Sequence, residues 1–60
     1  MSWIQYEVWG VVDGHESLIE CVATRKEADD IVETEREFHD EIYILQDTDG
    51  ELVEVVRYQA

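Results

Sequence analysis

The chain has 60 residues, of which 16 are Asp or Glu and only 4 are Lys or Arg, so its formal net charge is −12. This length allows a single domain, residues 1–60, and this acidity excludes direct binding of nucleic acid, which requires a basic surface. The sequence contains no apolar run near the roughly 18 residues of a membrane span and no signal peptide, so we expect no membrane association.

The composition points to a folded domain that needs support from outside its own core. About 45% of the residues are apolar, which excludes a disordered acidic tail. A domain this small buries only about 60% of the surface of its unfolded chain. A single cysteine, Cys21, excludes an internal disulfide, and no Cys and His residues have zinc-site spacing. We therefore expect a homodimer or a partner protein, and the lone cysteine favours a cytoplasmic location.

The first part of the chain predicts a β-hairpin. Residues 3–12 are rich in β-branched and aromatic side chains, which favours a strand. Asp13-Gly14 follows, a pair that is typical of hairpin turns. Residues 17–23 are expected to form the returning strand.

The clearest local signal is a helix that begins at Thr24. Thr24 and Glu27 have the spacing of a capping box, in which Thr24 accepts from a backbone N–H and the Glu27 carboxylate reaches back to the N–H of Thr24. The helix is expected to end near His39-Asp40. Its apolar stripe consists of Ala28, Ile31, Val32 and Phe38.

A second hairpin is predicted after the helix. Residues 41–46 and 52–58 read as strands, joined by a turn over residues 47–51 in which Gly50 suits a left-handed conformation. The element order is therefore ββαββ. We expect an α+β fold in which a four-stranded, mostly antiparallel sheet carries the one helix on one face.

Alternation of side chains along each strand separates the two faces of this sheet. In the third strand, either Ile42 with Ile44 or Tyr43 with Leu45 can face the helix, and we choose the first pair. The set expected to face the helix is Ile4, Tyr6, Val8, Gly10, Val12, Ile19, Cys21, Ala23, Ile42, Ile44, Val53 and Val55.

The opposite face keeps more apolar side chains than a surface in water normally carries. They are Trp3, Trp9, Val11, Leu18, Val22, Tyr43, Leu45, Leu52, Val56 and Tyr58. We expect a second copy or another protein to cover this face, with Trp3, Trp9, Val11, Tyr43, Val56 and Tyr58 as contacts. The alternative is a shifted register, or a curled sheet, that shields the two Trp residues.

Negative charge concentrates in the predicted helix, because eight of the 16 acids lie between Glu27 and Glu41. A globule of this length is about 27 Å across, and a DNA duplex carries about 16 charges over that distance. In size and composition the chain resembles the small acidic inhibitors that phages and mobile elements use against nucleic-acid-binding enzymes. The expected first contacts with a basic protein surface are Asp29, Asp30, Glu33 and Glu37.

The acidity is also compatible with different roles for the chain. It can be a homodimeric structural or accessory protein from a salt-adapted organism, in which only the sheet face is functional. The charge can also serve solubility above an apolar interface. A small-molecule sensor that binds at the two Trp residues is a further class of function.

No residue pattern indicates catalysis, a cofactor or a metal. Residues 47–51 place glycine at the fourth position, where a calcium loop requires it at the sixth. His39, Asp40 and Glu41 are adjacent in sequence and do not converge on one point. Cys21 lacks an activating base and is expected to be a small buried hydrophobe. We therefore expect a non-enzymatic protein-binding module.

Overall fold

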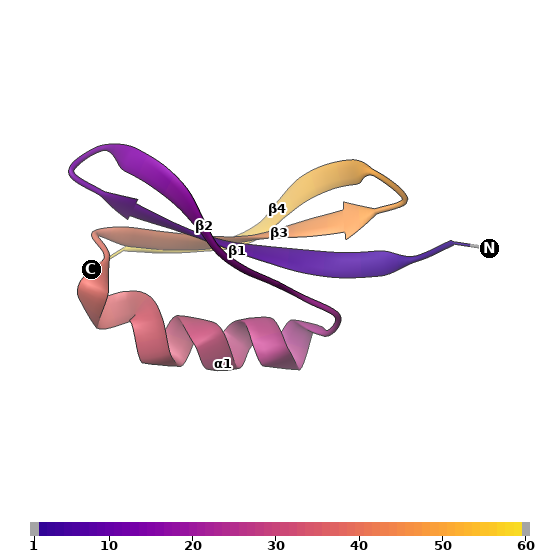
Figure 1. Ribbon diagram of the computed structural model, residues 1–60, viewed down its shortest axis with the longest axis horizontal. Helices are drawn as coiled ribbons and strands as arrows, with labels where there is room; N and C mark the ends of the chain where they lie inside the picture. The colour runs from indigo at the N-terminus through magenta and orange to yellow at the C-terminus, as the bar shows by residue number, and fades with distance from the viewer. Residues whose placement is uncertain (1, 60) are drawn as a thin grey trace.

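The computed structural model describes residues 2–59. One β-hairpin precedes the helical segment in the chain and a second one follows it (Figure 1). The strands form one antiparallel sheet in the order β2-β1-β3-β4. The predicted α+β class and ββαββ order are confirmed. The elements are β1 (Ile4–Val12), β2 (His15–Val22), α1 (Arg25–Glu35), the short 3₁₀ helix η1 (Arg36–Phe38), β3 (Glu41–Thr48) and β4 (Glu51–Gln59).

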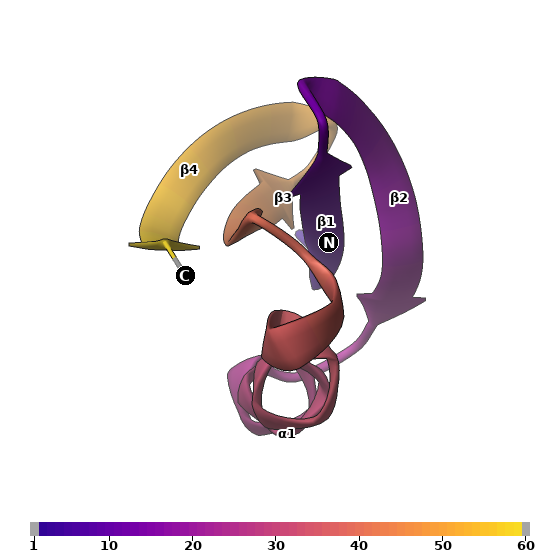
Figure 2. The ribbon, with the colours of Figure 1, turned by 90° about the vertical axis from the view of Figure 1, so that its left-hand side faces the viewer.

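The sheet is strongly twisted and longer than the helix that covers it. Both hairpin tips bend away from α1 (Figure 1), and the edge strands β2 and β4 curve down on either side of the helix (Figure 2). The molecule measures 38 × 20 × 15 Å, whereas the 11 residues of α1 span only about 16 Å. The helix therefore leaves the end formed by the start of β1 and the β3–β4 turn uncovered.

The core lies between α1 and the two central strands. Its buried members are Val8 from β1, Ala28 and Val32 from α1, and Ile42 and Ile44 from β3. The choice of Ile42 and Ile44 as the helix-facing pair is confirmed, as is the orientation of β1. Partly buried side chains that pack around this core are Tyr6, Ile19, Val22, Ile31, Val56 and Tyr58.

A β-bulge in β2 changes which side chains of this strand face the helix. Glu20 pairs with Val8 and Leu18 pairs with Trp9, so Ile19 is the extra residue. Beyond the bulge the alternation is inverted. Val22 consequently packs against the core, while the thiol of Cys21 is exposed. The predictions that Cys21 and Ala23 face the core and that Val22 faces away were wrong.

A second bulge has the same effect in β4. Val56 pairs with Ile44 and Glu54 pairs with Leu45, which leaves Val55 as the extra residue. Val56 and Tyr58 therefore lie on the helix side and pack against the core, and the Arg36 guanidinium lies 5.4 Å from the centre of the Tyr58 ring. The expected placement of Val56 and Tyr58 on the opposite face was wrong, as was the expectation that Val53 and Val55 are buried.

The helical segment begins at Thr24 and ends next to His39, as predicted, but its last turn is not α-helical. Thr24 caps α1, because its hydroxyl oxygen accepts from the backbone N–H of Glu27 at 3.2 Å. The Glu27 carboxylate accepts from the Thr24 hydroxyl at 3.0 Å, where the capping box predicted a bond to the Thr24 N–H. The last turn is the tighter 3₁₀ helix η1, which rotates Phe38 off the apolar stripe. Phe38 is 65% exposed, so its predicted core position was wrong.

The segment after η1 is tied to the end of β1. The backbone N–H of Asp40 donates to the carbonyl of Val11 at 2.7 Å, and the Asp40 carboxylate accepts from the N–H of Asp13 at 2.9 Å. The His39 ring packs directly on Gly10, where an added Cβ would lie 2.4 Å from Nδ1. Gly10 is therefore required in this strand by the close approach of His39.

Candidate protein-binding surfaces

The face of the sheet turned away from α1 is called the open face below. Side chains that alternate with the buried Val8 and Ile44 lie on this face. Four of them form one row across the sheet, because the pairing aligns Leu18 of β2, Trp9 of β1, Tyr43 of β3 and Arg57 of β4. Within this row, Tyr43 is covered by other side chains of the protein.

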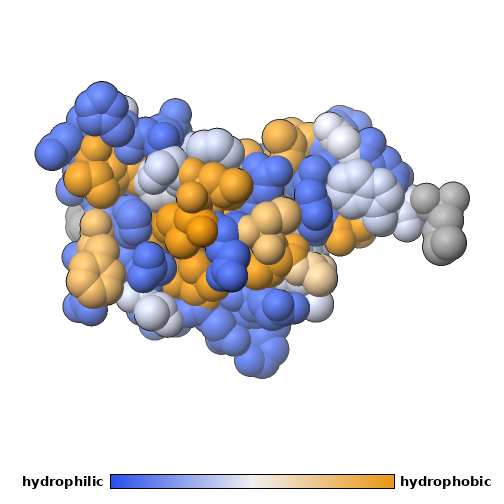
Figure 3. All heavy atoms as spheres, viewed as in Figure 1, coloured by the Kyte–Doolittle hydropathy of each residue, from blue (hydrophilic) through white to orange (hydrophobic). Residues whose placement is uncertain are grey.

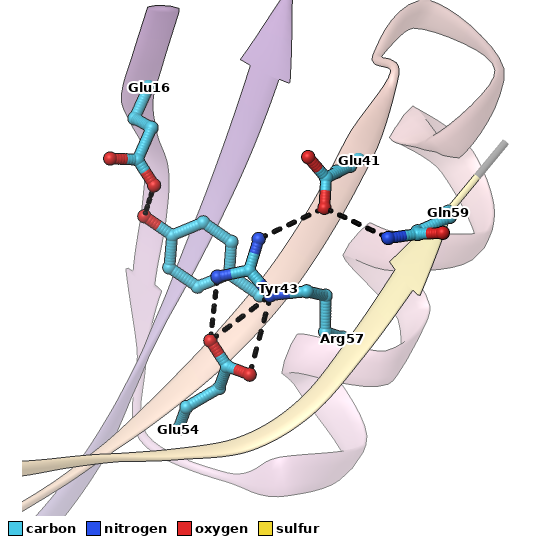
Figure 4. Close-up of polar contacts among 6 residues, drawn as sticks. All are labelled: Glu16, Glu41, Tyr43, Glu54, Arg57 and Gln59. Atoms are coloured by element: carbon cyan, nitrogen blue, oxygen red, sulfur yellow. Dashed lines mark hydrogen bonds and ion pairs between the residues drawn. The ribbon is translucent and has the colours of Figure 1, made fainter. Parts of the chain in front are cut away.

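Tyr43 closes the middle of the open face. Its hydroxyl reaches across β1 and donates to Oε1 of Glu16 on β2 at 2.7 Å (Figure 4). Val11 pairs with Glu16, so the Tyr43 side chain passes over Val11 on its way to the Glu16 carboxylate. Val11 and Tyr43 are therefore each only 7% exposed. Burial, followed by the hydrogen bond and negative charge of Glu16, raises the pKa of Tyr43 to about 12.

Arg57 covers the ring of Tyr43 from outside. Its guanidinium carbon lies 4.3 Å from the ring centre, a cation–π distance. The guanidinium also donates to Glu54 at 2.7 Å and to Glu41 at 3.1 Å (Figure 4). The hydrogen bond from Arg57 lowers the pKa of the Glu54 carboxyl. One arginine thus holds two carboxylates and one aromatic ring in a fixed arrangement.

Trp9 lies beside Tyr43 on the other side of the row. The two rings are nearly parallel, with an interplanar angle of 5° and a centroid distance of 6.3 Å. The indole Nε1–H donates to Oε1 of Glu7 at 2.9 Å, and Trp9 is half-buried. Trp9, Val11 and Tyr43 therefore lie together on the open face, but Val11 and Tyr43 are buried there by the protein's own side chains and are not the exposed apolar contacts that were expected. Trp3 lies at the uncovered end of the sheet, where its backbone N–H donates to the Asp49 carboxylate at 2.7 Å.

Of the four acids expected to make first contact, Asp30, Glu33 and Glu37 are exposed and Asp29 is partly exposed. Three of the four have a basic neighbour. Asp29 pairs with Arg25 at 3.0 Å, Asp30 with Lys26 at 3.2 Å and Glu33 with Arg36 at 3.9 Å. Glu37 forms no ion pair within residues 2–59. The spacing of four residues between Arg25 and Asp29, and between Lys26 and Asp30, is a signal in the sequence that indicates these pairs.

The unneutralised charge lies mainly outside the helical segment. Residues 25–38 hold six acids and three bases, whereas the rest of the chain holds ten acids and one base, Arg57. Nine of the twelve net negative charges therefore belong to the strands and their connections. The sequence-based prediction placed the negative surface on the helix because the three bases of the helical segment were not subtracted from its six acids.

A groove runs between β2 and α1 on the side shown in Figure 3, where apolar atoms gather between polar borders. Ile19 and Ile31 contribute its apolar part, and Glu20, Asp30, Thr34 and Glu35 contribute its polar part. The groove combines the edge strand of the sheet with three acids. It is therefore a second surface on which apolar and acidic side chains lie together.

Metal-binding groups and the cysteine thiol are the remaining features of the described residues to consider. Within residues 2–59 no group of three or more His, Cys, Asp or Glu side chains is placed to hold a metal ion. Cys21 is exposed, so its expected burial was wrong. Desolvation by neighbouring atoms, followed by the negative charges of Glu7 and Asp47, raises the pKa of its thiol, which keeps it in the less nucleophilic protonated form.

Comparison with protein-family models, with curated proteins and with solved structures found no match to this chain. Across residues 2–59 no helix has both the length and the apolar character required to cross a membrane.

Proposed function

We propose that this protein is a binding module without catalytic activity, which docks on a basic surface of another protein. The observation that carries this proposal is the uneven distribution of charge. Ten acids and a single arginine lie outside residues 25–38, and the acids on the open face are held in place by hydrogen bonds to Trp9, Tyr43 and Arg57. Ordered carboxylates attract a basic partner and select its orientation.

The dimensions support a more specific form of the proposal, in which the target surface normally binds nucleic acid. The protein is 38 Å long and 20 Å wide, longer than the roughly 27 Å expected for a round globule of this length. A DNA duplex carries about 22 charges over 38 Å. The 16 carboxylates of the chain are of the same order. Such a protein can occupy the nucleic-acid-binding groove of another protein and thereby inhibit that protein.

Competition with DNA tests this function. A panel of purified basic DNA-binding domains is loaded with a fluorescently labelled short duplex, and its release by this protein is followed by anisotropy. We expect release from at least one domain at about 50 mM NaCl and strong loss of the effect at about 500 mM, because exposed charges are screened over this range. Failure to release DNA from any domain, or release that is independent of salt, contradicts the proposal.

A homodimeric accessory protein is the second candidate, favoured by the uncovered end of the sheet. There Trp3, Ile4, Leu52 and Val53 are all about half-exposed, and a second copy could cover them. Sedimentation separates the candidates. A dimer that forms at high salt and at low protein concentration favours this second function, and a monomer at every salt concentration favours the first.

A further inference from the structure

The open face contains the same arrangement of side chains twice, and only one of the two is complete. On the β3–β4 half, the aromatic ring of Tyr43 lies between two carboxylates, Glu41 in the preceding row and Glu54 in the following row. Arg57 lies over this ring and pairs with both carboxylates, at 3.1 and 2.7 Å. The protein itself therefore shows how this surface holds a guanidinium group.

On the β1–β2 half, the aromatic ring is Trp9 and the two carboxylates are Glu7 and Glu16. Glu7 lies on the strand of its ring, as Glu41 does, and Glu16 lies on the edge strand, as Glu54 does. The pairing places Glu16 in the row of Glu41 and Glu7 in the row of Glu54, so an approximate two-fold rotation about an axis normal to the sheet relates the two halves. The position that matches Arg57 is taken by Leu18, which is 49% exposed and carries no charge. Within residues 2–59 neither Glu7 nor Glu16 forms an ion pair.

We propose that the β1–β2 half of the open face receives an arginine side chain of a basic partner protein, with its guanidinium over the Trp9 indole and paired with Glu7 and Glu16. This inference rests on the proposed function and specifies its contact surface. Tryptophan is the strongest aromatic partner for a cation. Arginine fits better than lysine because its planar group stacks on a ring and donates to two carboxylates together.

A second copy of the chain does not suit this site. All four basic side chains of the protein, Arg25, Lys26, Arg36 and Arg57, are already in ion pairs within the chain. Two copies would also bring together surfaces of the same sign, at a net charge of −12 each. A basic protein supplies the missing cation and neutralises the surrounding acids.

An octa-arginine peptide serves as the probe, with Trp3→Phe as the background so that Trp9 is the single indole. Binding is followed through the Trp9 indole N–H resonance and through fluorescence. The test variant is Glu7→Gln/Glu16→Gln, in which each side chain keeps an oxygen that can accept from Trp9 or Tyr43. The matched control is Glu33→Gln/Glu37→Gln, which removes the same charge from the helical segment, where the sequence alone predicts the first contacts, so the comparison separates that prediction from the present inference.

We expect the peptide to shift the Trp9 resonance and to bind the test variant about tenfold more weakly, the sum of two exposed charge pairs. The control should lose less than about threefold, and octa-lysine should bind the background protein more weakly than octa-arginine. If the double variant fails to fold, the single variants Glu7→Gln and Glu33→Gln provide the same comparison.

Two outcomes overturn the inference and leave the proposed function standing. One is an equal loss of affinity in test and control variants, which indicates attraction by total charge alone. The other is a Trp9 resonance that does not move when the peptide binds.

A concentration-dependent shift of this resonance without peptide assigns the site to a second copy and also overturns the inference. If octa-arginine does not bind at low salt, the inference and the proposed function both fail.

Discussion

The imidazole of His39 occupies the space that a side chain at position 10 would fill. An added Cβ would lie 2.4, 2.7 and 2.9 Å from three atoms of this ring, all closer than van der Waals contact allows. The connection on which His39 lies is itself held to β1 by Asp40. A single glycine therefore permits the close packing of this connection against the sheet.

Gly10→Ala should lower the free energy of unfolding by about 1–3 kcal/mol, the usual cost of overpacking. The measurement is urea denaturation of the variant in two backgrounds, the natural sequence and His39→Ala. The penalty should be smaller in the second background, because the ring that collides with the methyl group is absent. An equal penalty in both backgrounds would show that His39 is not its cause.

Tyr43 gives the protein a response to alkaline pH. Its pKa is about 12 in the fold against an ordinary value of 10.0. Because the folded state holds the proton more tightly, this contribution to stability is complete below about pH 10 and is lost as the pH rises to about 12. Tyrosinate absorbance in an alkaline titration should show a late phase that Tyr43→Phe lacks. Glu16→Gln should move this phase to lower pH, since Glu16 contributes to the raised pKa.

At the scale of elements, the parts of the fold with local sequence signals were predictable. The Asp13-Gly14 turn, the Thr24 cap and the alternation along β1 each depend on neighbouring residues, and each was predicted. The bulges at Ile19 and Val55 were not, because an extra residue in an edge strand has no characteristic residue type. Each bulge inverts the alternation of side chains beyond it, so the predicted face was wrong for the side chains that follow it in the strand.

The bulge in β4 predicts an inverted order of mutational cost. Val56→Ala should destabilise the fold by about 1–2 kcal/mol, because Val56 packs against the core. Val55→Ala should cost less than about 0.5 kcal/mol, because Val55 is 38% exposed. Urea denaturation measures both. A larger cost for Val55→Ala would favour the unbulged strand that simple alternation predicts.

The arginine arrangement on the open face was not predictable for the same reason. Glu54 and Arg57 are three residues apart, which in a regular strand places them on opposite faces. The extra residue Val55 brings them to one face, where Arg57 covers Tyr43. The ion pairs of the helix, by contrast, were open to prediction from their spacing. Candidate surfaces on edge strands thus require the structure, while those on the helix can be derived from the sequence.

At the scale of the whole molecule, repulsion among acids opposes folding. Raising NaCl from about 50 to about 500 mM should therefore increase the urea concentration at the midpoint of unfolding. The exposed ion pairs of the helix are also screened, but each contributes only about 0.3–0.5 kcal/mol. A variant with fewer charges, such as Glu33→Gln/Glu37→Gln, should gain less from salt. A midpoint that falls as salt is added would show that attractive pairs outweigh repulsion.

The concentration of bases on the helical segment formed by α1 and η1 also gives the molecule an electric dipole moment. With three of its four cations on the helical segment, the helix is the less negative pole and the sheet is the more negative one. The field of a positively charged surface then exerts a torque before any atoms touch. If the protein docks on a basic surface as proposed, this torque turns the sheet toward that surface and increases the fraction of collisions in the binding orientation.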